Sequence, residues 1–144
     1  MTVKRSQRLQ VVLMLAERKE QEAARHLSEF QQLVDGEKQQ LETLIVYKDQ
    51  YIEQYTRQQN TMASAQMSRY SEFIQHLGGV VSNQRQKLEQ LLVQLETVRQ
   101  HWQTLRYKRR AIDDLVARLA REEDAEAERL LQKMLDDMTP RQRR

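Results

Sequence analysis

The sequence predicts an all-α protein: a long antiparallel coiled-coil hairpin of two helices, the second longer than the first and overhanging it. Charged residues make up 31% of the 144 residues and the mean hydropathy is −0.86, a composition typical of long helices. Apolar residues recur at alternating spacings of three and four along two stretches of the chain. The lone proline, Pro140, lies close to the C-terminus, so no proline interrupts either stretch.

The first predicted helix covers approximately residues 5–57. Its repeating positions form a heptad seam, the stripe that faces a partner helix in a coiled coil. Only Glu20, Glu37 and Lys48 are charged in this seam. The full seam consists of Leu9, Leu13, Ala16, Glu20, Ala23, Leu27, Phe30, Val34, Glu37, Leu41, Leu44, Lys48, Tyr51 and Tyr55.

The second predicted helix covers approximately residues 67–138. Past Leu119 it has no partner within the chain, because acidic Glu123 and Glu126 occupy former seam positions, and this overhang is expected to fray or to dock elsewhere. The basic tail, residues 139–144, is expected to be disordered. The seam before the overhang consists of Met67, Tyr70, Ile74, Leu77, Val81, Gln84, Leu88, Leu91, Leu95, Val98, Trp102, Leu105, Arg109, Ile112, Val116 and Leu119.

The turn between the helices is predicted at residues 58–66, which are small and polar. The alternative is a turn at the adjacent glycines Gly78 and Gly79. We favour the first position because the seam passes straight through the glycines, from Leu77 to Val81. The pair then lies outside the seam, where it loosens the helix and lets the backbone of a partner approach.

The register of an antiparallel pair follows from the position of its turn. Facing residues should have numbers that sum to about 125, which places Tyr55 near Tyr70 and bulky Trp102 opposite small Ala23. A slip of one heptad in either direction remains open at this stage.

The sequence offers little for catalysis. Nothing matches a phosphate-binding loop, there is no cysteine, and His26, His76 and His101 lack metal-ligand spacing. A helix spreads the acidic side chains of residues 122–128 around its circumference, so a solvated face is a better interpretation than a cation site. We expect no enzyme activity, no cofactor and no metal.

Charge and hydropathy bear on partners and location. The net charge of +3 is too small to indicate nucleic acid by itself, although the basic stretch 106–110 leaves an RNA-binding arm as an alternative. No apolar run is long enough to span a membrane, and residues 1–20 only faintly resemble a signal peptide. A cytoplasmic location without membrane insertion is the better prediction.

Some apolar residues remain after the seams are assigned. Near the turn, Tyr47, Phe73 and Val80 fall on one flank beside seam residues Tyr51 and Leu77. Flanks of free coiled coils are normally charged, so this strip predicts a docking site; a locally thickened core is the alternative.

A second apolar excess lies at the other end of the predicted hairpin. Residues 11–15 cover most of the helix circumference, and Leu115 and Val116 should lie at a similar height. One partner helix cannot bury them all. Apolar surfaces at both ends predict a connector between two larger bodies, and a scaffold that self-associates into four-helix bundles is an alternative.

Two segments carry a family resemblance. LIVYKDQY at 44–51 and YSEFIQHL at 70–77, followed by a leucine seam that reaches Trp102, resemble the flagellar export protein FliJ family over nearly the whole chain. The resemblance implies an antiparallel coiled coil, similar to the central stalk of rotary ATPases, in the flagellar type III export apparatus. It further implies insertion into the export ATPase ring, binding to the linker of the export gate's cytoplasmic domain, and escort of export chaperones. Such a protein is cytoplasmic, peripheral at the inner membrane through the apparatus, and serves motility and chemotaxis. The equivalent stalk of a virulence secretion system is a close alternative.

The resemblance also implies site residues. Two of those at the gate, Val80 and Gln84, depart from the alanine and histidine that the family prefers. The implied gate-binding residues are Tyr47, Tyr51, Phe73, Leu77, Val80 and Gln84. The residues implied to contact the ATPase ring are Val11, Val12, Met14, Leu15, Arg106, Lys108, Arg109, Arg110 and Arg118.

Overall fold

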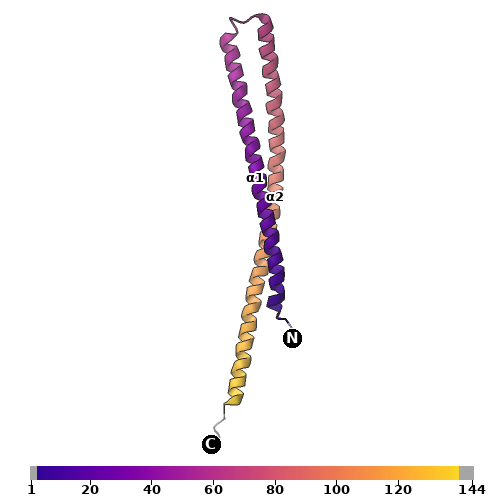
Figure 1. Ribbon diagram of the computed structural model, residues 1–144, viewed down its shortest axis with the longest axis vertical. Coiled ribbons are helices and arrows are strands. Elements are labelled where there is room, and N and C mark those ends of the chain that lie inside the picture. The colour runs from indigo at the N-terminus through magenta and orange to yellow at the C-terminus, as the bar shows by residue number, and fades with distance from the viewer. Residues whose placement is uncertain (1–2, 140–144) are drawn as a thin grey trace. The chain divides into compact units, whose positions relative to one another are not determined.

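Two antiparallel helices and the turn between them make up almost all of the computed structural model, which describes residues 3–139 (Figure 1). Helix α1 spans Arg5–Gln58 and helix α2 spans Ser64–Met138. The predicted hairpin with a longer second helix is confirmed.

The turn occupies residues 59–63. Helix α1 ends one residue later than expected and α2 begins three residues earlier, at Ser64. Gln58 accepts hydrogen bonds from the backbone N–H and the hydroxyl of Thr61, each at 2.9 Å, which closes the end of α1. The alternative turn at Gly78 and Gly79 is wrong, because both glycines lie inside α2. Of the expected disordered tail, residues 140–144 lie outside the described residues.

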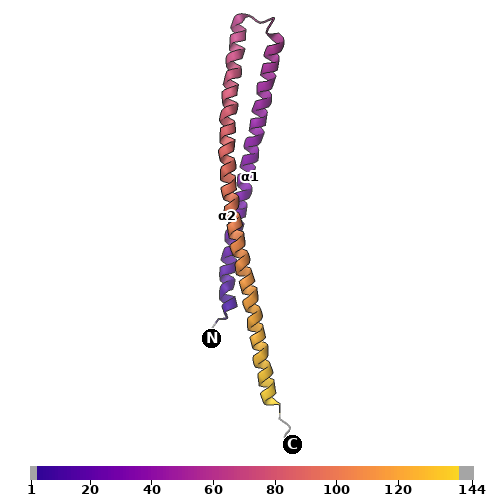
Figure 2. The same ribbon diagram turned by 180° about the vertical axis from the view of Figure 1, so that it is seen from behind.

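Contacts divide the chain into two compact units, and both helices contribute to each. The turn-end unit comprises residues 25–100. The open-end unit combines the first part of α1, up to Ala24, with the part of α2 that begins at His101. Figure 2 shows the same two helices from behind, again side by side within the turn-end unit.

The predicted seams are confirmed residue by residue, since every seam position on both helices is buried or half-buried. The most deeply buried apolar residues all belong to the seams: Ala23, Val34, Leu77, Val81 and Val116. Because a pair of helices has one stripe of mutual contact, this seam is the hydrophobic core of each unit.

Within the turn-end unit, the predicted register is met. The rings of Tyr55 and Tyr70 lie 6.3 Å apart between centroids. The two polar seam residues also meet: the Gln84 side-chain amide donates to the Glu37 backbone carbonyl at 3.3 Å and to its carboxylate. Lys87 Nζ lies 3.0 Å from Glu37 Oε1. A slip of one heptad, about 10 Å along a helix, would separate these groups.

Within the open-end unit, a second polar pair crosses the seam. Arg109 Nε donates to Glu20 Oε2 at 2.6 Å, and a second nitrogen of the same guanidinium reaches Oε1 at 3.4 Å. Both side chains are largely shielded, with exposed fractions of 24% and 17%. Such a two-point ion pair fixes the relative height of the two helices.

The seam extends one turn beyond its predicted end at Leu119. Glu123 accepts a hydrogen bond from the Ser6 backbone N–H at 3.1 Å and another from the Ser6 hydroxyl. The N–H groups of a first helical turn have no partner inside their own helix, and a negative charge is favourable there. The expectation that α2 lacks a partner past Leu119 is therefore wrong by one turn, because Glu123 caps the start of α1.

The carboxylates of these three polar contacts are held ionised. The pKa of Glu20 is lowered, first by its hydrogen bond from Arg109, and that of Glu37 is lowered by Gln84 and then Lys87. The pKa of Glu123 is lowered by the hydroxyl and backbone N–H of Ser6. Each contact is therefore strongest when its carboxylate carries a full charge.

Beyond Glu123, α2 continues to Met138 (Figure 1). We call residues 124–138 the overhang; all of its side chains are exposed. In the part of the chain that the structure describes, neither helix combines the length and apolar character that crossing a membrane requires.

Replacing Gly78 and Gly79 together by alanine should stabilise the turn-end unit by about 1–2 kcal/mol, because glycine lowers helix stability and an added Cβ meets no atom within 4 Å at either position. Urea unfolding followed by circular dichroism measures this change. Gly36→Ala, inside α1 with the same free space, should give about half the gain. A loss of helicity in the double variant would contradict a continuous α2.

Acid should destabilise the hairpin. The folded pKa values of Glu20, Glu37 and Glu123 lie below the ordinary 4.5, so their contribution is present above that pH and is lost as the pH falls through the lowered values. Thermal unfolding between pH 7 and pH 3 tests this expectation. Glu20→Gln should reduce the loss of thermal stability between pH 7 and pH 3, whereas Glu22→Gln, on the exposed face of α1, should leave that loss unchanged. An equal loss of stability in the two variants would count against the assignment.

Candidate partner-binding surfaces

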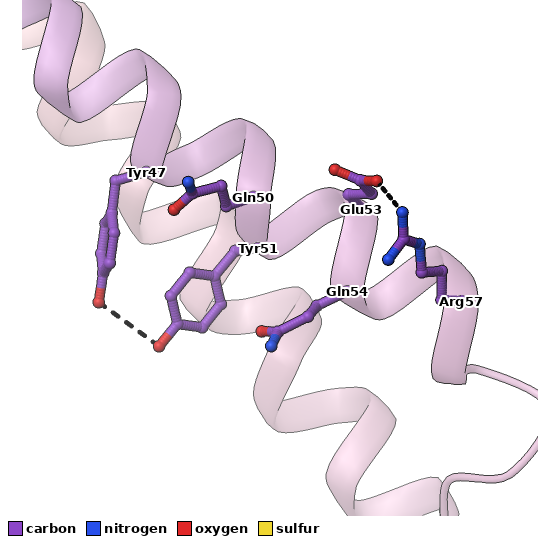
Figure 3. Close-up of a pocket in the computed structure, with 6 residues that line it drawn as sticks. All are labelled: Tyr47, Gln50, Tyr51, Glu53, Gln54 and Arg57. Carbon is purple, nitrogen blue, oxygen red and sulfur yellow. Dashed lines mark hydrogen bonds and ion pairs between the residues drawn. The ribbon is translucent and has the colours of Figure 1, made fainter.

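An aromatic cluster lies across the helices near the turn. The ring centroid of Tyr51 is 4.7 Å from that of Phe73, 5.0 Å from that of Tyr47 and 6.0 Å from that of Tyr70. Figure 3 shows Tyr47 and Tyr51 on successive turns of α1, with their hydroxyl groups 3.4 Å apart. The hydrogen bond that the two hydroxyl groups share raises the pKa of Tyr51.

This cluster is open to solvent on the α1 side. Tyr47 is 43% exposed, and Val46 beside it is 55% exposed. Shallow grooves adjoin both tyrosines, and an ion pair between Glu53 and Arg57 forms one edge. One groove is lined by the residues drawn in Figure 3: Tyr47, Gln50, Tyr51, Glu53, Gln54 and Arg57.

The six residues implied to bind an export gate differ in accessibility. Tyr47 is exposed, while Tyr51, Phe73 and Val80 are half-buried. Leu77 and Gln84 are buried in the seam, at 5% and 9% exposure. The surface available to a partner in this conformation is therefore the aromatic cluster with Val80, and Leu77 and Gln84 support it from beneath.

An apolar surface is exposed on α1 in the open-end unit. The exposed fractions of Val11, Val12, Met14 and Leu15 lie between 45% and 56%. A groove between α1 and α2 begins at this surface, and lysines stand on both of its sides. The groove is lined by Val12, Leu15, Ala16, Lys19, Leu105, Lys108 and Ile112.

The basic residues predicted to contact an ATPase ring have different environments. Arg106 is half-buried and lies over the Trp102 ring, 5.3 Å from its centroid, a cation–π contact. Arg109 is engaged by Glu20, which raises its pKa. Lys108, Arg110 and Arg118 are exposed. The first two arginines therefore serve the hairpin itself, and the exposed three are open to an acidic partner.

Sequence reasoning missed two features of the open-end unit. It did not foresee that Glu123 accepts hydrogen bonds from Ser6, although Glu123 lies at a seam position and the first-turn N–H groups of a helix favour a negative charge. It also left unassigned the apolar residues of the overhang, whose spacing of three and four residues was visible: Leu130, Leu131, Met134, Leu135 and Met138.

Neither surface contains the arrangement of groups that a metal site needs. Among residues 3–139, no three histidine, cysteine, aspartate or glutamate side chains gather closely enough to hold an ion. Both surfaces instead combine exposed apolar side chains with charged neighbours, as protein-docking surfaces do.

Comparison with known proteins identifies a matching family. The model of a family described as "Flagellar FliJ protein" matches residues 5–144, nearly the whole chain. No curated protein and no solved structure matches.

Truncating Tyr51 should destabilise the turn-end unit more than truncating Tyr47. Tyr51→Ala removes ring contacts with three aromatic neighbours and should cost about 2–3 kcal/mol, whereas Tyr47→Ala should cost about 1 kcal/mol because 43% of Tyr47 is already exposed to solvent. Urea unfolding at pH 7 compares the two. Equal losses would mean that Tyr47 is a core residue, and the exposed aromatic surface would lose its basis.

Proposed function

The chain belongs to the flagellar FliJ family, and from that membership we propose that it is a non-catalytic stalk or adaptor of the flagellar type III export apparatus. Membership itself establishes an association with flagellar protein export. The finer role that we propose is to insert into the export ATPase ring and to contact the export gate, with escort of export chaperones. The cytoplasm, at the inner membrane through the apparatus, is the matching location.

The observation that carries the proposal is that each unit exposes apolar side chains outside the seam. A two-helix hairpin is stabilised by its seam, so exposed valine, leucine and tyrosine side chains outside the seam are not needed to stabilise the fold. Contiguous apolar surface of this kind is characteristic of interaction sites. Two such surfaces, one in each unit, suit a protein with two partners.

We assign the open-end unit to the ATPase ring. Its exposed apolar residues adjoin a groove flanked by Lys19 and Lys108, and Arg110 and Arg118 add exposed positive charge. Such a surface suits the inside of a ring that presents apolar and acidic side chains.

We assign the turn-end unit to the gate. An extended linker peptide can lie in the shallow grooves beside Tyr47 and Tyr51, where the rings offer apolar area and the hydroxyl groups offer hydrogen bonds. Val80, which is half-buried, adds apolar bulk to the edge of this surface.

The equivalent stalk of a virulence secretion system is disfavoured by the flagellar family match. The RNA-binding arm is disfavoured by the engagement of Arg106 with Trp102 and of Arg109 with Glu20, which removes two of its cations. An affinity for RNA that falls steeply with salt and with replacement of Lys108 and Arg110 would instead support the RNA-binding alternative.

A crossed pair of variants tests the proposal. The purified chain should alter ATP hydrolysis or ring assembly by the export ATPase, and Val12→Asp with Leu15→Asp should weaken this effect at least about tenfold by placing charges in an apolar contact. The same variant should still bind the gate's cytoplasmic domain. Tyr47→Ala should show the reverse pattern. No effect of the unmodified chain on the ATPase, or equal losses by both variants in both assays, would refute the assignment.

A further inference from the structure

The overhang carries an unpartnered apolar stripe. Its large apolar side chains are between 50% and 77% exposed. Their spacing of three and four residues places them on one face of the helix, which only Leu130 shares with the seam, because the seam positions that follow are Lys133 and Asp137. In the described chain no part of α1 lies opposite this face, because the last contact with α1 is at Glu123. The stripe consists of Leu130, Leu131, Met134, Leu135 and Met138.

Acidic side chains bracket the stripe at both ends. Asp124, Glu126 and Glu128 precede it, and Asp136 and Asp137 accompany its last turn. The overhang has only two basic residues, and one of them, Arg129, is paired with Glu126 at 2.8 Å. The overhang is therefore a helix with an apolar centre and negative ends.

Helix α1 presents the complementary pattern within the same unit. Arg8, Val11, Leu15 and Arg18 recur at spacings of three, four and three, and all four are exposed. Lys4 precedes this row and Lys19 follows it, beside the groove that Leu15 lines. This face of α1 thus has an apolar centre and positive ends.

We propose that two copies of the chain associate through their open-end units, each overhang docking on the exposed face of the other copy's α1. When the two-fold axis is perpendicular to the helices, the two α2 helices are antiparallel, so each overhang runs parallel to the partner's α1. An offset of about 120 residue numbers then aligns the two patterns along their whole length. It sets Leu131 and Leu135 over Val11 and Leu15 of the partner subunit, and Glu128 beside the partner's Arg8.

Charge excludes one other occupant of the stripe, and helix geometry excludes another. Overhangs paired with one another would bring two acidic segments together, which is unfavourable. The same chain cannot cover its own stripe, because α2 is a continuous helix that leads the overhang away from α1. The inference requires no export partner and stands independently of the proposed function.

Sedimentation of the full chain tests the association. We expect a reversible monomer–dimer equilibrium that weakens as salt is raised from 50 to 500 mM, because the flanking charge pairs are solvent-exposed. Leu131→Asp with Leu135→Asp should weaken the dimer at least about 100-fold, since two apolar contacts are lost at each of two sites. Val93→Asp, which replaces a 69% exposed residue of the turn-end unit, is the matched control and should dimerise normally.

Charge reversal tests the pairing. Arg8→Glu with Arg18→Glu should weaken the dimer, and adding Glu128→Arg with Asp137→Arg in the same chain should restore it. A chain that stays monomeric at every concentration, or a dimer that the overhang variant leaves intact, would overturn the proposal.

Cross-linking distinguishes the docking mode, because the chain has no cysteine of its own. A mixture of Leu15→Cys and Leu135→Cys chains should form a disulfide between unlike chains under mild oxidation. Preferential linkage of Leu135→Cys to itself would instead show overhang pairing and would refute the docking on α1.

Discussion

A single seam of side chains holds this protein together. Because residues 3–139 form only two helices, no second layer of that part of the chain shields what the seam leaves uncovered, so each seam residue contributes directly to stability. Polar residues at Glu20, Glu37, Gln84 and Arg109 interrupt the apolar stripe, and each is paired across it. Removing one partner would leave a shielded polar group unsatisfied, so these pairs specify register as well as supporting the hairpin.

The fold was predictable to a large degree because the repeat of three and four residues encodes it directly. Both seams were assigned correctly, and the position of the turn followed from the loss of phase between them. The exact pairing was less accessible. The sequence displayed Glu20 and Arg109 as separate exceptions, and only the structure shows that the two side chains form an ion pair across the seam.

The candidate surfaces were predictable only in outline. Periodicity identified Tyr47 and residues 11–15 as surplus to the seam, but it could not give their exposure, which depends on side-chain direction as well as helical position. Periodicity assigned Leu77 and Gln84 to the seam, where the partner helix covers both, whereas the family resemblance counted them among the gate-binding residues. The overhang was expected to fray or to dock elsewhere, and the sequence did not show which, since a single chain contains nothing to set opposite it. The two proposals place Val11 and Leu15 in both the ring contact and the dimer, so the two assemblies would exclude one another.

The placement of aromatic residues has a practical consequence. The only tryptophan, Trp102, belongs to the open-end unit and lies beneath the Arg106 guanidinium. Light near 295 nm excites indole but not phenol, so emission from this one ring reports on the open-end unit alone. The protein thus carries an intrinsic optical reporter that can be followed without a label while the tyrosine-rich turn-end unit remains dark.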